Sequence, residues 1–356
     1  MLSGEVYIAS TGEGSSARAV GQGMNVQDKA PAAAATADMA LRDRVGALRA
    51  GLEDGLIGAS GLVQRLLIGL LTGGHVLVEG APGLAKTRAV KRLSSGLDAS
   101  FARIQCTPDL MPADLTGTTV WRPDQGRFEF LPGPIFHSLV LVDEINRAPP
   151  KVQSALLEAM AERQVTAGAS TYPLPDPFMV VATQNPIEHE GTFPLPEAQL
   201  DRFLMHVVVG LPDTTSERLI LDLVERETAG HEQAMPLKLS GEEVRAARRD
   251  VANVYLAPAL KDYIVRLVSA TRDADTVPEV RRAIEYPVSP RGTLSLAAAS
   301  KARAYLEGRD HVTPDDVADL AADTLAHRLV LTWRAAADGR TARDLVGPLL
   351  DAVRPL

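Results

Sequence analysis

The sequence predicts an α/β fold with a parallel sheet, followed by a helical region, and three observations carry this prediction. The glycine-rich octapeptide GAPGLAKT, residues 80–87, separates an apolar run from a helical pattern. The run SLVLV, residues 138–142, is typical of a buried parallel strand and ends in the carboxylates Asp143 and Glu144. Beyond Pro212 the apolar residues recur with the period of helices.

The chain before the octapeptide divides into a tail and two helices. Residues 1–37 are rich in Gly, Ser and Ala, so we expect a tail without a fold. The patterns at 42–54 and 59–71 predict helices, and His75 to Glu79 predicts the first strand.

The octapeptide has the strand, turn and helix order of a loop that binds phosphate. Gly80 and Gly83 allow a tight turn whose N–H groups point at phosphate oxygens. Lys86 supplies a positive charge for the β- and γ-phosphates, and the Thr87 hydroxyl can ligate magnesium. The predicted ATP-binding residues are Gly80, Ala81, Pro82, Gly83, Leu84, Ala85, Lys86 and Thr87.

Ala85 departs from the general pattern G-x-x-x-x-G-K-[ST], which has glycine before the lysine. Alanine adds one methyl group, which the loop tolerates if this residue has helical dihedrals. Taken alone, the motif also fits a Gly/Pro turn that happens to end in Lys-Thr.

Two further strand ends converge on the same predicted crevice, because ligands of open α/β sheets lie beyond the carboxyl ends of the strands. Asp143 would hold magnesium, usually through water, and Glu144 would polarise the attacking water as general base. The pairing with the loop disfavours the alternative, a solvated turn. A third buried strand, 178–185, has a polar end, where Asn185 can donate and accept hydrogen bonds near the γ-phosphate.

The two strand ends lie within longer segments that resemble a known protein family. Four segments closely resemble the MoxR family of AAA+ ATPases, and the resemblance extends from about Leu56 to near Arg334. It implies an AAA+ P-loop three-layer αβα sandwich with a parallel sheet, followed by a small all-α lid domain. The segments are Arg103 to Gly117, Leu139 to Thr166, Val180 to Phe203 and Ser289 to Leu296.

The resemblance also implies roles for single residues. It makes Asn185 sensor 1, Arg202 an arginine finger that reaches a neighbouring subunit's nucleotide, and Arg291 sensor 2 on the lid. It places Ile57 and Gly58 beside adenine. A finger from the next protomer makes hydrolysis depend on assembly, so a ring follows, which we expect to be hexameric. Without the motif context, either arginine could equally form a surface ion pair.

We expect three parts of the chain: the tail at 1–37, a large α/β ATPase domain at 38–211 and a helical lid at 212–356. An insert near 106–135 would carry a hairpin turning at Asp124-Gln125-Gly126. Its aromatic residues Trp121 and Phe130 could grip a client or pack on their own domain. A second hairpin is predicted around Gly168. The predicted later helices are 216–227, 241–253, 257–271, 291–307 and 313–328.

Composition agrees with a cytoplasmic protein. The 356 residues are 46% hydrophobic and 23% charged, enough for two domains with substantial cores. The single cysteine, Cys106, suits a reducing compartment as an apolar filler. A formal charge of −8 disfavours general nucleic-acid affinity. No export signal opens the chain, and the apolar window 62–78 reads as helix plus strand rather than as a membrane span.

We therefore expect a MoxR-type ATPase that hydrolyses Mg-ATP in a homo-oligomeric ring. The resemblance implies chaperone-like work on protein clients, including metal-cofactor insertion or complex assembly, with von Willebrand factor A (VWA) domain proteins as partners. One alternative is a nucleic-acid-associated AAA+ motor, and another is a regulatory module that binds nucleotide without turning it over. The histidine spacings predict no metal other than nucleotide-bound magnesium.

Overall fold

The structure is a computed structural model that describes residues 40–355, apart from 169, 187–190, 232–233 and 274. The tail expected at 1–37 lies outside the described residues. A five-stranded sheet forms the centre, with strand order β10-β1-β9-β6-β3 and parallel pairing throughout. Its strands are β1 (Val76–Gly80), β3 (Phe101–Gln105), β6 (Leu139–Asp143), β9 (Met179–Gln184) and β10 (Met205–Val209).

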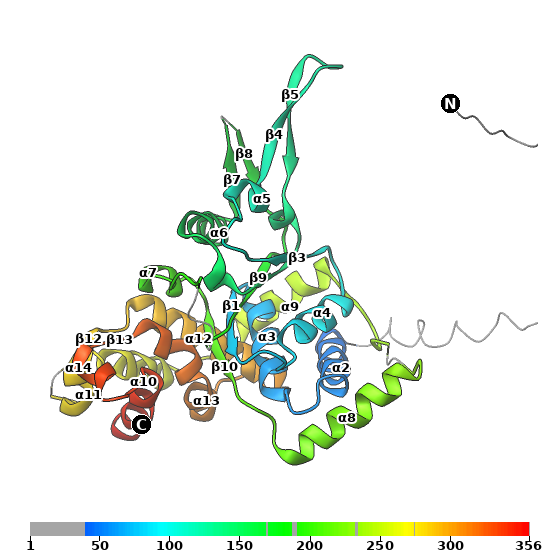
Figure 1. Cartoon of the computed structure of the whole chain (residues 1–356). Coiled ribbons are helices and arrows are strands. Elements are labelled where there is room, and N and C mark those ends of the chain that lie inside the picture. The colour runs from blue at the N-terminus through cyan, green and yellow to red at the C-terminus, as the bar shows by residue number, and fades with distance from the viewer. Residues whose placement is uncertain (1–39, 169, 187–190, 232–233, 274, 356) are drawn as a thin grey trace, which may run out of the picture. The chain divides into compact units, whose positions relative to one another are not determined.

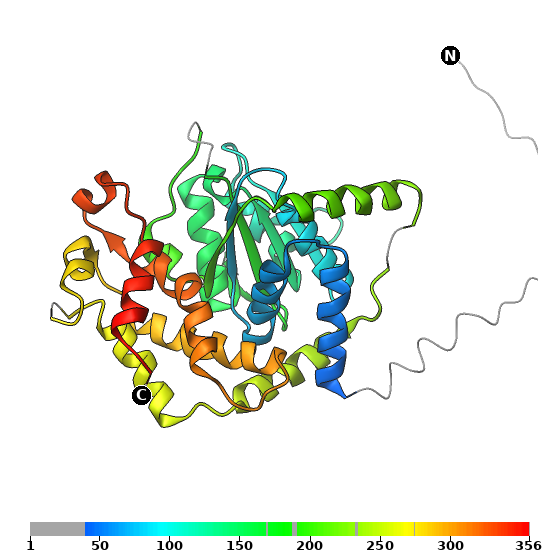
Figure 2. The same cartoon turned by 90° about the horizontal axis from the view of Figure 1, so that it is seen from below.

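Alternate residues of the central strands enter two separate cores, one on each face of the sheet. Leu139 and Leu141 of β6 belong to one hydrophobic cluster, whereas Val140 and Val142 belong to the other. Because side chains alternate along a strand, a strand covered on both faces needs the continuous apolar run seen in the sequence. The predicted three-layer α/β architecture is confirmed, and Figure 2 shows the sheet between its helices.

Helices surround the sheet and continue to the end of the chain (Figure 1). The first face carries α2, α3 and α4, and α6 packs on the second. α13 begins as predicted, with Thr313 as N-cap, Pro314 at the first position and Asp316 completing a capping box. The helices before β10 are α2 (Leu41–Asp54), α3 (Ser60–Thr72), α4 (Lys86–Ser95), α5 (Pro112–Thr116), α6 (Pro150–Glu162) and α7 (Glu197–Leu200). Those after it are α8 (Thr214–Thr228), α9 (Gly241–Asn253), α10 (Pro258–Ser269), α11 (Pro278–Ala283), α12 (Pro290–Leu306), α13 (Pro314–Leu325), α14 (Trp333–Ala337) and α15 (Val346–Ala352).

The C-terminal helices share the core of the first face. Leu67 of α3 and Leu320 of α13 belong to one contiguous cluster, so the boundary expected near Pro212 stays a prediction. The expectation of helix alone beyond Pro212 is wrong at three short strands. β11 (Leu239–Ser240) pairs with β2 (Leu97–Asp98), and β12 (Ile284–Tyr286) pairs with β13 (Val330–Leu331). Two or three residues are too short to leave a periodic signal.

Among the described residues no helix is both long and apolar enough to cross a membrane.

Two hairpins project from the body, as Figure 1 shows. β4 (Gly117–Arg122) pairs with β5 (Arg127–Pro132), and β7 (Gln164–Ala167) pairs with β8 (Ser170–Pro173). The aromatic side chains divide between the two expected roles. Phe130 stacks on Tyr172 with ring centroids 4.1 Å apart, whereas Trp121 and Phe128 contact each other and are 49% and 69% exposed. Packing therefore accounts for Phe130 and leaves Trp121 on the surface.

His75 joins the start of β1 to its neighbours through two hydrogen bonds. The Val180 N–H donates to Nδ1 at 2.9 Å, and Nε2 lies 3.3 Å from the Met160 carbonyl oxygen. Both contacts need the neutral ring with its proton on Nε2. Burial lowers the pKa of His75 from 6.5 to about 4.

This burial predicts a pH dependence of stability. The unfolded chain takes up a proton on His75 near pH 6.5, but the folded chain does so only near pH 4. The free energy of unfolding therefore falls as pH drops through this window, by roughly 3 kcal/mol in total for this group. We expect urea unfolding of a His75→Gln variant to change less between pH 7 and pH 5 than that of wild type. Replacing the exposed His231 by glutamine is the control, and equal pH dependence in all three chains would contradict the assignment.

Candidate active site

The loop between β1 and α4 surrounds the Lys86 ammonium group. Lys86 is the first residue of α4, and its Nζ donates to the carbonyl oxygens of Gly80 at 2.6 Å and Ala81 at 2.7 Å. Desolvation lowers the pKa of Lys86, opposed by the nearby carboxylates of Asp143 and Glu144. The charge is thus placed at the mouth of the loop, beside the start of a helix.

Backbone geometry explains the glycines of the loop and corrects the expectation for Ala85. A Cβ on Gly80 would lie 2.9 Å from the Val209 carbonyl oxygen, and Gly83 has φ of 84°. Ala85 has φ of 53° and ψ of 16°, so its dihedrals are left-handed and not helical. A residue with a Cβ pays about 1–2 kcal/mol there, which explains why the general pattern has glycine.

Asp143 ends β6 and connects three elements. Its Oδ1 accepts from the Thr87 hydroxyl at 3.2 Å and from the Thr183 hydroxyl at 3.0 Å. Arg103 Nε donates to Oδ2 at 2.7 Å. The Asp143 side chain is 6% exposed, so its charge is held by these groups rather than by water. The phosphate loop and the acidic strand end therefore meet, as the sequence predicts.

Glu144 follows directly and has an unusual backbone. Its φ of 57° and ψ of 52° are left-handed, a conformation that persists in a non-glycine residue only where the surroundings enforce it. Its N–H donates to the Thr183 hydroxyl at 2.9 Å. Its carboxylate accepts from Gln105 Nε2 and Arg147 Nη1, both at 3.0 Å. These hydrogen bonds fix the Glu144 side chain beside Asp143. Strained backbone conformations of this kind are concentrated at functional sites.

One polar pocket collects these groups. Asn185, which follows β9 and is 5% exposed, lies in it together with Lys86, Thr87 and the two carboxylates. Arg103, Gln105 and Thr183 also line it, although no sequence motif pointed to a role for them. The complete lining is Pro82, Gly83, Leu84, Ala85, Lys86, Thr87, Arg88, Arg103, Gln105, Asp143, Glu144, Thr183, Gln184 and Asn185.

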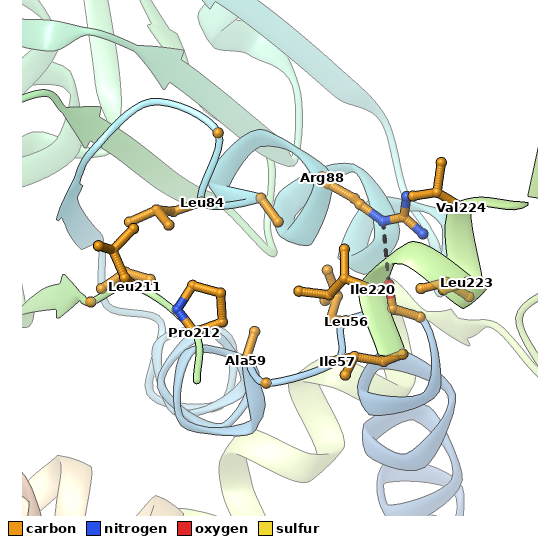
Figure 3. Close-up of a pocket in the computed structure, with 16 residues that line it drawn as sticks. Leu56, Ile57, Ala59, Leu84, Arg88, Leu211, Pro212, Ile220, Leu223 and Val224 are labelled. Carbon is orange, nitrogen blue, oxygen red and sulfur yellow. Dashed lines mark hydrogen bonds between the residues drawn. The ribbon is translucent and has the colours of Figure 1, made fainter. Parts of the chain in front are cut away.

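An apolar pocket adjoins the polar one and shares Gly83, Leu84, Ala85 and Arg88 with it. Figure 3 shows its walls, which come from the connection of α2 and α3, the connection of β10 and α8, and α8 itself. Arg88 bridges the walls, because it donates to the Gly55 carbonyl oxygen at 3.3 Å and pairs with Glu227 of α8. The labelled apolar residues are Leu56, Ile57, Ala59, Leu84, Leu211, Pro212, Ile220, Leu223 and Val224. An apolar slot beside a polar cradle suits a planar base attached to phosphates.

The two predicted arginines lie elsewhere. Arg202 donates to the Leu157 carbonyl oxygen and lines neither pocket. Arg291, at the start of α12, lies 3.1 Å from the Asp201 carboxylate, which the buried Arg328 also contacts at 2.7 Å. Within one chain, then, the structure does not bring Arg202 or Arg291 to the polar pocket.

Comparisons with known proteins agree with this geometry. Residues 75–205 match the ATPase family associated with various cellular activities (AAA), and residues 279–349 match the AAA lid domain. The chain is 45% identical over 300 residues to the Chaperone MoxR1 of Mycobacterium tuberculosis, across 84% of this chain and 78% of that protein. The chain belongs to the MoxR family of AAA+ ATPases. The family predicted from the sequence is confirmed.

Other MoxR relatives extend the comparison. The chain is 34% identical over 301 residues to the Protein MoxR of Paracoccus denitrificans, across 80% of this chain and 87% of that protein. A crystal structure of a candidate ATPase from Cytophaga hutchinsonii superposes with a TM-score of 0.81 at 40% identity, covering 89% of this chain and 96% of that one. The AAA match contains the phosphate loop, both carboxylates and Arg202, and the lid match contains Arg291.

Membership in an AAA+ family implies a magnesium nucleotide, and the donor set fits one. The Thr87 hydroxyl and the Asp143 carboxylate, 3.2 Å apart, are the hard oxygen ligands that magnesium prefers. Within the described ranges no group of three or more His, Cys, Asp or Glu side chains is arranged to hold a metal by itself. Thr87 and Asp143 line the same polar pocket as Lys86.

Proposed function

We propose that this MoxR-family chain hydrolyses Mg-ATP in a ring and uses the cycle to remodel or mature protein clients. The convergence of Lys86, Thr87, Asp143 and Glu144 on one pocket carries the proposal. The adjoining apolar pocket would take adenine. The presence of Ile57 and Gly58 in its wall supports this part of the proposal. Cytoplasmic location and a hexameric ring, expected from the sequence, belong to this proposal.

Each residue of the pocket has a distinct task in the proposed reaction. Lys86 leaves the carbonyls of its own loop and binds the β- and γ-phosphate oxygens. Magnesium held through Thr87 and Asp143 would neutralise charge on those oxygens. Glu144 accepts a proton from the attacking water, whose oxygen bonds to the γ-phosphorus as the bond to ADP breaks. The products of this step are ADP and inorganic phosphate. Asn185 forms hydrogen bonds near the γ-phosphate.

The arginines complete the site in the assembled ring. Arg202 would act on a neighbouring subunit's nucleotide, which fits its position away from the pocket of its own chain. Arg291, whose side chain is 54% exposed, would leave Asp201 and report the γ-phosphate to the lid. Arg328 would keep Asp201 anchored during that change.

The β4–β5 hairpin is the proposed contact for clients. Trp121 and Phe128 form an exposed aromatic pair at a hairpin that projects from the body (Figure 1). Large exposed aromatic groups are typical of protein interaction sites. The relative in Mycobacterium tuberculosis is named a chaperone. We include VWA-domain proteins among the proposed partners, as the family resemblance implies.

The first test is hydrolysis by the purified chain. We expect magnesium-dependent release of phosphate from ATP, and we expect a Lys86→Ala variant to lose nucleotide binding measured by fluorescent ADP titration. Lys91→Ala is the control, because Lys91 lies on the same helix outside the polar pocket. Wild-type nucleotide affinity in the Lys86 variant would contradict the proposed site. Stimulation of hydrolysis by DNA or RNA would instead favour a nucleic-acid motor.

A further inference from the structure

Arg103 forms a strong contact with the carboxylate proposed to hold magnesium. It lies on the edge strand β3, and its Nε donates to Asp143 Oδ2 at 2.7 Å. Its Nη2 also donates to the Gln105 side-chain oxygen at 3.2 Å. The pair is charge-assisted and joins a cation to an anion that is almost fully buried. The guanidinium thus supplies positive charge on the carboxylate oxygens that a divalent cation would use.

The partners of Asp143 differ in how easily they can leave. The Thr183 side chain is buried and also accepts the Glu144 N–H, so its place is fixed. The Arg103 side chain is 44% exposed, whereas that of Asp143 is 6% exposed. A long, half-exposed side chain on an edge strand can turn away without disturbing the core. Arg103 is therefore the exchangeable partner of Asp143.

We propose that Arg103 couples magnesium binding to nucleotide binding by acting as an exchangeable counter-ion of Asp143. Resting on the proposed function, this adds a residue that decides when the site accepts a metal. A free divalent cation must break the Arg103–Asp143 pair without giving Arg103 a new partner. A magnesium nucleotide brings phosphate oxygens into the pocket that Arg103 lines, and these offer the freed guanidinium an anion. The site therefore rejects the bare metal and accepts the metal with its nucleotide.

The most direct test measures metal binding without nucleotide. We expect an Arg103→Gln variant to bind Mn²⁺ about tenfold or more tightly than wild type in electron paramagnetic resonance titrations, because Asp143 loses its competing cation. An Arg103→Lys variant keeps the charge without the planar fork and should lie between the two. The matched control is Arg122→Gln, since Arg122 pairs with Glu129 at the same 2.7 Å and is 41% exposed, but lies on the hairpin. Equal Mn²⁺ affinity in wild type and both Arg103 variants would overturn the proposal.

A second readout separates this inference from the proposed function. Fluorescent ADP affinity, measured with and without Mg²⁺, should give a ratio for Arg103→Gln that is about tenfold smaller than for wild type, because coupling between two ligands is reciprocal. The reason is that in the variant the metal binds Asp143 without displacing Arg103, so the nucleotide no longer favours metal binding by taking up the freed guanidinium. An unchanged ratio would count against the role of Arg103 while leaving the nucleotide site intact. Failure of every chain to bind ADP would instead refute the proposed function, and the Mn²⁺ titration would still judge Arg103.

Discussion

An Arg202→Ala variant is expected to bind ATP as wild type does but to hydrolyse it about 10³ to 10⁵ times more slowly. The reason is geometric. In one chain Arg202 donates to the Leu157 carbonyl oxygen and lines neither pocket, so its removal leaves the pocket of its own subunit unchanged. Its loss would be felt only where a neighbouring subunit's transition state lacks the compensating positive charge. Single-turnover hydrolysis and fluorescent ADP titration measure the two quantities separately.

Two further variants sharpen this expectation. Arg202→Lys keeps a point charge without the planar fork and should recover only part of the rate. Arg249→Ala removes an exposed arginine from α9 and should hydrolyse ATP as wild type does. Full hydrolysis by Arg202→Ala would show that no subunit depends on this residue, and the proposed finger would be wrong.

A Glu144→Gln variant should hydrolyse ATP about 10² to 10⁴ times more slowly while keeping its affinity for ATP. Glutamine has the same shape and still accepts the hydrogen bonds that Gln105 and Arg147 donate, but its amide cannot take a proton from water. The control is Glu129→Gln on the hairpin, because Glu129 is also a half-exposed carboxylate held by one arginine. Hydrolysis by Glu144→Gln at the wild-type rate would remove Glu144 from the role of base.

The same variant provides a way to capture clients, because a chain that binds ATP without hydrolysing it should hold a client that normally leaves. We expect proteins retained by Glu144→Gln with ATP to be lost when Trp121 and Phe128 are both replaced by alanine. The double substitution should leave hydrolysis unchanged, since these side chains lie on the hairpin and not in either pocket. Retention that does not depend on the aromatic pair would place the client contact elsewhere.

Most residues of the candidate site could be predicted from the sequence, because each motif is a short continuous segment. Lys86 follows its loop directly, and Asp143 and Glu144 end one strand, so the position of each follows from a short segment. The parallel sheet then brings the segments together without further information, because the carboxyl ends of its strands meet at one edge. The confirmed fold class and family rest on the same short segments.

Site residues that are positioned by tertiary contacts could not be predicted from the sequence. Arg103 and Gln105 become site residues only because β3 pairs with β6, with Gln105 opposite Asp143. Because side chains alternate along a strand, the sequence indicates that Arg103 and Gln105 share one face of β3. It does not indicate that β6 is the neighbouring strand. The left-handed Ala85 was hidden because alanine rarely adopts that conformation. The α8 wall of the apolar pocket arises from packing between segments far apart in the chain.

The central claim is that one chain's pocket is completed by the arginine of its neighbour, and mixing two inactive variants tests it most directly. Arg202→Ala retains an intact pocket, and Glu144→Gln retains an intact finger. Rings mixed at random from equal amounts, verified by native mass spectrometry, should recover roughly a quarter of wild-type hydrolysis, because half of the pockets are intact and half of those face an intact Arg202. Mixed rings that remain as inactive as either variant alone would contradict the account.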